Sequence, residues 1–285
     1  METFYLNPEN LADFQQNATP SVMALGFFDG IHNGHREVIK TAFQKASEMN
    51  IPLSVMSFFP HPKSVLSNGK TQIDYLMPLS DKERIFSELG VDIFYIVEFD
   101  KEFAALSPEK FTAKYLVALG VVHAVAGFDY TYGFRGEGRM DRLKNDSGSV
   151  LGVTKVNKVE YQGEKISSTC IREKLASGNV EELPAFLGRP YEMACDWDGS
   201  TLKVRPHYTL PAPGRYVVTV KGAFQSHVME MKVTKEKHLI PQRSDLEFAA
   251  MHNEILSIVW HERIHGNRND SLYKDNWFQG FVHIG

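Results

Sequence analysis

Residues 26–35 read Gly-Phe-Phe-Asp-Gly-Ile-His-Asn-Gly-His and have the residue types of a phosphate-binding loop. They follow a short apolar run at 21–25 and precede a stretch with helical spacing. Glycines let the backbone approach a phosphate closely, and a helix N-terminus offers free N–H groups with partial positive charge. His32 and His35 can share one helix face and donate to phosphoryl oxygens. The segment predicts a phosphate site, and the alternative is a glycine-rich turn that carries two surface histidines.

Other nucleotide and metal motifs are weaker. The dinucleotide pattern G-x-G-x-x-G and the Walker lysine pattern are absent from the sequence, which disfavours a dehydrogenase or a P-loop kinase. Residues 261–265 fit the zinc-protease signature H-E-x-x-H, which requires a helix, but the preceding residues are typical of a strand. On a strand the two histidines would lie roughly 13 Å apart, too far to share a zinc ion. Two cysteines, Cys170 and Cys195, cannot form a four-thiolate site, so we predict no metal held by protein ligands alone.

The elements that must position the loop alternate between strand and helix. Strands are predicted at 21–25, 51–58, 92–98 and 121–126, and helices at 8–16, 35–49, 80–89 and 107–119. Ser80 and Glu83 predict a capping box for the third of these helices. The alternation implies parallel β-α-β units and a doubly wound α/β domain whose ligands bind beyond the carboxyl ends of the strands.

The sequence pattern changes after residue 187. Short alternating segments at 215–220, 228–233, 246–251 and 256–261 predict antiparallel strands and a small β-barrel. We therefore expect an α/β domain over residues 1–187 and a barrel domain over residues 188–285.

Composition sets the class of protein and of partner. The 285 residues are 43% hydrophobic and 23% charged, which is typical of a globular protein. The formal net charge is −4 and the basic residues form no tail, which disfavours nucleic-acid binding. The N-terminus lacks the pattern of a signal peptide, and the longest apolar stretch is too short to span a bilayer. We expect a cytoplasmic protein that acts on small molecules, without a membrane or nucleic-acid partner.

Six motifs lie in a fixed order between about residues 20 and 191. They are GFFDGIHNGH at 26–35, SFFPHP at 57–62, FAALSPE at 103–109, GFDYTYG at 127–133, ISSTCIR at 166–172 and LGRPY at 187–191. Together they resemble the bacterial FAD synthetase family, in which an adenylyltransferase domain of the nucleotidyltransferase superfamily precedes a riboflavin kinase barrel. The resemblance implies FMN adenylyltransferase activity, in which FMN and ATP, with Mg²⁺, give FAD and pyrophosphate.

The resemblance also implies residue roles. It places His32, His35 and Arg172 at the reacting phosphates, although by itself Arg172 is typical of a helix surface. It implies ATP contacts for Gly26, Phe28, Asp29, Gly30, Gly34, Ser168 and Thr169, and FMN contacts for Pro60, His61, Pro62, Asp129, Tyr130 and Thr131. Asp129 has the alternative of a turn-capping residue. Phe59 stands where the family usually carries an acid, and a ring in its place could stack on the flavin.

The resemblance is incomplete in the second domain. The kinase loop G-F-P-T-A-N, which serves Mg²⁺ and ATP, is expected shortly after Tyr191, and residues 196–207 contain no such loop. Residues 211–216 and 246–248 still resemble a kinase turn and the strand that carries the kinase glutamate. We therefore expect an adenylyltransferase without riboflavin kinase activity. The alternatives are a flavin-binding regulator that keeps the pocket without turnover, and an enzyme with another phosphorylated acceptor, which GFDYTYG and LGRPY disfavour.

Overall fold

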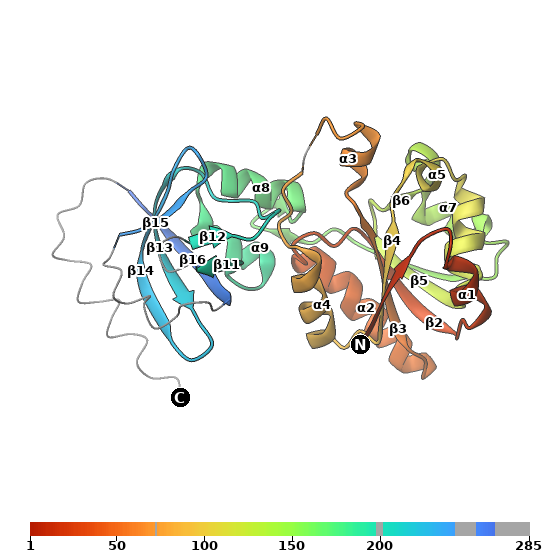
Figure 1. Ribbon diagram of the computed structural model, residues 1–285. Coiled ribbons are helices and arrows are strands. Elements are labelled where there is room, and N and C mark those ends of the chain that lie inside the picture. Colours follow the sequence, from red (N-terminus) through yellow and green to blue (C-terminus); the bar gives the residue numbers. More distant parts are fainter. Residues whose placement is uncertain (72, 198–201, 243–254, 266–285) are drawn as a thin grey trace. The chain divides into compact units, whose positions relative to one another are not determined.

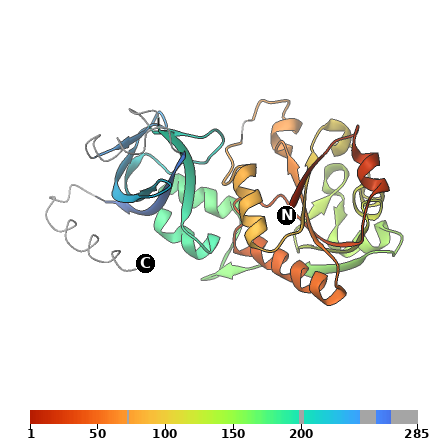
Figure 2. The same ribbon diagram turned by 60° about the horizontal axis from the view of Figure 1, so that its bottom comes forward.

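The computed structural model describes residues 1–71, 73–197, 202–242 and 255–265. Contacts divide the chain into two compact units, Met1–Ser168 and Thr169–Gly285. The first unit is α/β and the second contains a β-barrel (Figures 1 and 2). The division of the chain after residue 187, expected from the sequence, stays a prediction. No helix in the described part of the chain combines the length and the apolar character that a bilayer crossing requires.

A parallel sheet of six strands forms the centre of the first unit, in the order β1-β4-β3-β2-β5-β8. The strands are β1 (Glu2–Leu6), β2 (Ser21–Leu25), β3 (Leu53–Phe59), β4 (Ile93–Glu98), β5 (Val121–Gly127) and β8 (Gly152–Val156). The apolar runs predicted the four inner strands. They did not predict β1 and β8, because both lie at sheet edges, are only partly buried and carry no continuous apolar run.

Helices cover both faces of this sheet. They are α1 (Leu11–Gln16), α2 (Asn33–Met49), α3 (Pro62–Leu66), α4 (Leu79–Glu88), α5 (Lys101–Ala104), α6 (Pro108–Phe111), the π-helical turn η1 (Thr112–Val117) and α7 (Met140–Asp146). In Figure 1, α2 and α4 lie on one face and α1 and α7 on the other. Two buried clusters match these layers: one packs residues of α2 and α4 on the sheet, and the other packs residues of α1, η1 and α7.

Two helix starts differ in how they are capped. The predicted capping box at Ser80 is wrong, because α4 begins at Leu79 after Pro78 and has no side-chain cap. The proline fixes the extended backbone that starts the helix one residue earlier. Ser107 does cap α6, since the backbone N–H of Lys110 donates to its Oγ over 3.3 Å.

The strand order reverses between β2 and β5. From β2 the chain adds β3 and β4 on one side, whereas β5 and β8 lie on the other. A crevice opens beyond the carboxyl ends of strands at such a switch point. The loops that follow these two strands carry the motifs at residues 26–35 and 127–133, so the sheet order brings them to one place.

The second unit confirms the predicted barrel. Its closed antiparallel ring follows the order β11-β12-β15-β14-β13-β16. The strands are β11 (Tyr191–Trp197), β12 (Leu202–Val204), β13 (Gly214–Lys221), β14 (Ser226–Val233), β15 (Leu239–Pro241) and β16 (Ile255–Ile264). Before them come α8 (Ser168–Ser177), the short 3₁₀ turn η3 (Val180–Glu182) and α9 (Leu183–Leu187). The strand expected at 246–251, with the kinase-like residues 246–248, lies outside the described residues, as does part of the expected kinase-loop region.

The H-E-x-x-H motif lies at the end of a strand, as expected. His261 is in β16, where its Nε2 lies 2.7 Å from the Thr219 hydroxyl, and the strand ends just before His265. Within the described ranges, no cluster of three or more His, Cys, Asp or Glu side chains is arranged to hold a metal ion.

Candidate functional site

The two histidines of the loop after β2 meet at the start of α2. His32 is the N-cap of the helix, and its Nδ1 accepts from the backbone N–H of His35 over 3.2 Å. A neutral imidazole whose Nδ1 accepts carries its proton on Nε2, so His32 has an N–H donor left for a ligand. Both rings line the same cavity, which confirms that the three-residue spacing brings them together.

Burial keeps both imidazoles neutral. It lowers the pKa of His32 to about 4, despite an opposing effect of Asp129, and holds the pKa of His35 well below its usual value. The positive charge of Lys82 further lowers the pKa of His35. At neutral pH the two histidines are therefore uncharged hydrogen-bond donors. The negative charge of a bound polyphosphate would favour their protonated, charged form.

Glycines and strained residues shape the loop. Phe28 and Ile31 are fully buried with φ of 53° and 40°, and Gly30 has φ of 82°. A Cβ at Gly26 would lie 2.9 Å from Cζ of Phe28, and one at Gly34 would lie 3.1 Å from Cε1 of His32. The glycines thus leave room for the rings packed against them, while the non-glycine residues hold a conformation that needs support from their surroundings.

The carboxylate of Asp29 provides part of that support. It is 1% exposed and accepts from the backbone N–H groups of Leu76 and Met77, at 3.0 to 3.1 Å. Its backbone carbonyl accepts from Oγ of Ser168 over 2.9 Å. Asp29 therefore ties the loop to the segment before α4 and to the ISST motif.

A cavity of about 890 Å³ in the first unit joins the loop to an aromatic region. The site residues predicted from the sequence that line this cavity are Gly26, Phe28, His32, Gly34, His35, His61, Pro62, Asp129, Tyr130, Thr131 and Ser168. Aromatic rings also line it, namely Phe58, Phe99, Phe103, Phe111, Tyr130 and Tyr132, and so do the cationic residues Lys101, Arg135, Lys158 and Lys165. Asp29, Gly30 and Pro60 are not among the described residues that line the cavity, and the ligand contacts expected for them stay predictions.

The departure at Phe59 has a different consequence from the one expected. Its ring stacks on that of Tyr75 with centroids 6.3 Å apart, and Phe59 is not among the described residues that line the cavity. Nearby, His61 caps α3, because its Nδ1 accepts from the backbone N–H of Lys63 over 3.0 Å. The backbone N–H of His61 donates to the Tyr75 hydroxyl. Phe59 thus packs against Tyr75, which in turn holds the backbone of His61.

Asp129 pairs with a lysine that no sequence motif had indicated. Nζ of Lys165, on the hairpin strand β10 (Glu164–Lys165), lies 2.6 Å from Oδ2 of Asp129 and 4.8 Å from the ring centroid of Phe128. The lysine directly precedes the ISST motif, but a single lysine at that place gave no distinctive pattern. The ion pair therefore lies on the cavity wall, and each partner compensates the charge of the other.

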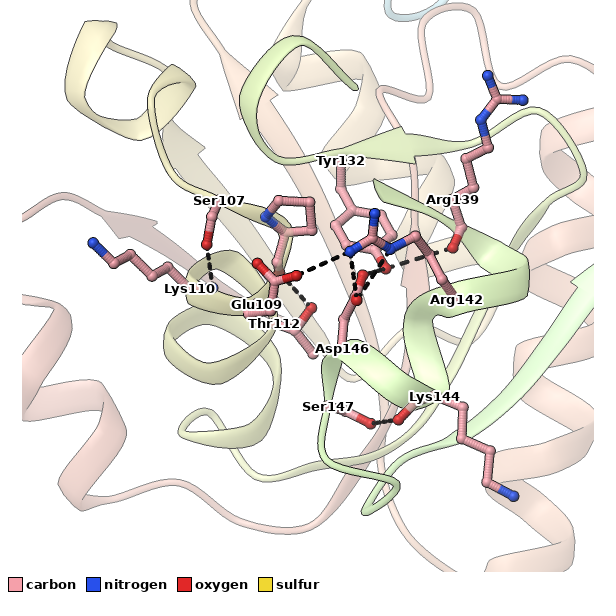
Figure 3. Close-up of polar contacts among 11 residues, drawn as sticks. Ser107, Glu109, Lys110, Thr112, Tyr132, Arg139, Arg142, Lys144, Asp146 and Ser147 are labelled. Carbon is pink, nitrogen blue, oxygen red and sulfur yellow. Dashed lines mark hydrogen bonds and ion pairs between the residues drawn. The ribbon is translucent and has the colours of Figure 1, made fainter. Parts of the chain in front are cut away.

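A polar network fixes the aromatic wall from behind (Figure 3). The hydroxyl of Tyr132, in β6 (Thr131–Tyr132), donates to Oδ2 of Asp146 over 2.6 Å. Arg142 donates to Oδ1 of Asp146 over 3.1 and 3.0 Å and to Oε1 of Glu109 over 2.9 Å. Burial, together with Asp146, raises the pKa of Tyr132, so the hydroxyl keeps its proton and the tether persists at neutral pH.

Thr169 and Arg172 lie in the second unit, on α8. The expectation that they act with the histidines stays a prediction.

Comparisons with known proteins agree with the motifs. A family model described as FAD synthetase matches residues 14–170. A bifunctional riboflavin kinase/FMN adenylyltransferase from Listeria monocytogenes is 38% identical over 99% of this chain and 90% of that protein. One with the same name from Bacillus subtilis is 45% identical over 67% of this chain and 60% of its own length. A crystal structure described as a macrolide-efflux protein from Streptococcus pneumoniae has a TM-score of 0.80 at 29% identity, covering 96% of this chain and 94% of that one.

Proposed function

The chain belongs to the FAD synthetase family, and from that premise we propose that it transfers AMP from ATP to FMN, giving FAD and pyrophosphate. The observation that supports this most is one cavity lined by two different groups of side chains. One group is the histidine pair at a helix N-terminus, and the other is the set of aromatic rings. The first has the chemistry to bind a polyphosphate, and the second to bind a flat isoalloxazine.

The proposed reaction makes modest demands on the protein. The phosphate of FMN is ionised at neutral pH and needs no general base to attack the α-phosphorus of ATP. Catalysis then depends on in-line positioning and on stabilising the charge that develops on pyrophosphate. His32 and His35 donate to the ATP phosphates, and the loop backbone places them beside the acceptor. Lys165, paired with Asp129, lies on the same wall and could exchange that carboxylate for a phosphate oxygen.

Arg172 and Thr169 complete the ATP site in this proposal, as the family motif ISSTCIR implies. An arginine donates two parallel hydrogen bonds to a phosphate, which a lysine cannot reproduce. We expect Arg172→Lys to lose most of the activity that Arg172→Ala loses, and an equal rate for Arg172→Lys and wild type would contradict this role.

Mg²⁺ fits the proposal as an ion that arrives with ATP. Asp129 is the one acidic side chain among the described residues that line the cavity, and it is paired with Lys165. Magnesium commonly binds through substrate phosphates and keeps several waters, so it needs few protein ligands. Its contribution would be to neutralise phosphate charge, while Ser168 and the two histidines orient the same phosphates.

Conversion of FMN to FAD tests the function directly. Purified protein with FMN, ATP and Mg²⁺ is expected to form FAD and pyrophosphate in equal amounts, followed by chromatography and a coupled pyrophosphate assay. Nicotinate mononucleotide and phosphopantetheine serve as control acceptors, and faster turnover of either would replace the proposed substrate. Binding of FMN and ATP without pyrophosphate release would favour a flavin-binding regulator.

We further propose that the barrel does not phosphorylate riboflavin, because residues 196–207 lack the kinase loop. The Listeria and Bacillus relatives are named for both activities, so this is where the chain would differ from them. Incubation with riboflavin, ATP and Mg²⁺ is expected to give no FMN, and FMN formed at a rate comparable with that of FAD synthesis would contradict it. With small-molecule substrates and a net charge of −4, we propose action in the cytoplasm without nucleic acid, which cell fractionation tests.

A further inference from the structure

Lys82 is a buried cation beneath the histidine loop. It lies on α4 and is 1% exposed, although lysine is rarely buried because its charge loses hydration. Its Nζ donates to the backbone carbonyl of Phe27 over 2.8 Å and lies 3.4 Å from Oγ of Ser57. Ser57 donates to the same carbonyl over 2.8 Å. One carbonyl oxygen of the loop thus accepts from a charged donor and a neutral donor.

That carbonyl comes directly before the strained part of the loop. Phe28 follows it with a positive φ, and Ile31 has another. Such conformations cost on the order of 1 to 3 kcal/mol each and persist only where surrounding contacts determine them. The ring of Phe27 is also held, because Nζ of Lys82 lies 4.6 Å from its centroid and the His61 ring packs against it with centroids 4.6 Å apart.

The surroundings of Lys82 leave its ammonium charged despite its burial. Burial lowers its pKa to about 8, and the negative charge of Asp29 opposes that shift, so the ammonium remains mostly protonated at neutral pH. In return, the ammonium helps to keep the neighbouring His35 uncharged. Lys82 is not among the described residues that line the cavity, so it would act on the site through the loop.

We propose that Lys82 is a positioning residue: by fixing the Phe27 carbonyl, its ammonium holds the strained loop in the form that presents His32 and His35 to the ATP phosphates. The inference builds on the proposed function, but it makes a separate claim about the loop of the unliganded protein. The loop contacts of Lys82 can be tested separately from its contribution to overall stability, because the two predict different effects on substrate KM values.

The principal test is Lys82→Met, which keeps the length of the side chain and removes the charge and the donor. Because one charged hydrogen bond to the loop is lost, we expect KM for ATP to rise about 10- to 100-fold. KM for FMN should change less than about threefold, and the melting temperature shows whether the fold as a whole is weakened. Lys82→Gln keeps an N–H donor and should recover part of the ATP affinity. Lys40→Met, on the exposed face of α2, is the matched control and should behave as wild type.

A readout without substrates separates this inference from the proposed function. In hydrogen exchange followed by mass spectrometry, Lys82→Met should raise exchange in peptides that cover residues 26–32 and leave α7 unchanged. Ser57→Ala removes the neutral donor to the same carbonyl and should give a smaller increase there. If FAD is not formed but exchange in the loop rises, the function fails and the role of Lys82 in the loop stands. If the loop of Lys82→Met exchanges at the wild-type rate, or if KM rises equally for both substrates, the inference is overturned. Should Lys82→Met not fold, the same measurements on Lys82→Gln decide it.

Discussion

The imidazole rings of His32 and His35 lie face to face, with centroids 3.6 Å apart and planes 16° from parallel. Two charged imidazolium rings at this distance would repel each other strongly in a buried environment. The stack therefore requires at least one neutral ring, in agreement with the lowered pKa values of both side chains. The pair is arranged to donate hydrogen bonds without carrying charge until an anionic ligand arrives.

Replacement of His35 should affect the chemical step. We expect His35→Ala to lower the rate of FAD formation at least about 10²-fold, which is typical for loss of one preorganised donor. The measurement is FAD formed per enzyme under saturating ATP and FMN, with circular dichroism as the check on folding. His238→Ala, an exposed histidine on the barrel, is the matched control. A loss of less than about threefold would remove His35 from the proposed site.

The buried His32 should make the protein less stable in acid. Its pKa is about 4 in the folded protein and about 6.5 in the unfolded chain, so between these values the unfolded chain binds more protons. Stability is therefore expected to fall as the pH falls from about 6.5 towards 4, by up to about 3 kcal/mol from this residue.

Denaturant unfolding at a series of pH values measures that dependence. His32→Asn keeps a side chain that can cap α2 but removes the titrating ring, so its curve should be flatter than that of wild type over the same range. Carboxylates titrate in both proteins, and the difference between the two curves isolates the histidine. Parallel curves would show that protonation of His32 is not linked to folding.

The tether on Tyr132 should matter for the aromatic part of the cavity lining, where we propose that FMN binds. Tyr132→Phe removes the bond to Asp146 and leaves the ring in place. We expect KM for FMN to rise about 3- to 10-fold, which corresponds to one hydrogen bond, while KM for ATP is unchanged. Tyr5→Phe, on the exposed edge strand β1, is the control for loss of a phenolic hydroxyl. Equal effects on both KM values would indicate a general loss of structure instead.

Restoring the acid that the family carries at Phe59 should have little effect on flavin binding. Phe59 is 40% exposed and stacks on Tyr75 outside the cavity lining, so we expect Phe59→Asp to change KM for FMN less than about threefold. The lost stacking should lower the free energy of unfolding by about 1 kcal/mol. Phe59→Tyr keeps the stack and is the comparison variant. A change of tenfold or more in KM for FMN would mean that this position acts on the substrate.

Local patterns predicted the parts of the protein that short stretches of sequence determine. Residues 21–25 are a continuous apolar run and form a fully buried strand, and the histidines meet because they stand three positions apart at the start of one helix. The strands of the barrel show the alternating burial that their sequence predicts, as in β13. These features need no information from distant residues.

Contacts between distant residues could not be predicted in the same way. Lys82 reaches Phe27 across 55 positions, and nothing in the sequence around it distinguishes it from a surface lysine on an amphipathic helix. Asp146 likewise meets Tyr132 only because α7 packs behind the short strand β6. The supporting residues of the site therefore appear only once the packing is known, whereas the residues at its centre carry a recognisable motif.

The position of β1 in the sheet has a consequence for synthesis of the chain. β1 is made before β4, its partner in the sheet, and Glu2 pairs with Ile93 roughly 90 residues later. At elongation rates of about 5 to 20 residues per second, that interval lasts on the order of 5 to 20 s. Until β4 emerges, water must satisfy the backbone groups of the N-terminal strand, so this edge of the nascent protein is completed only after the strands at its middle have been made.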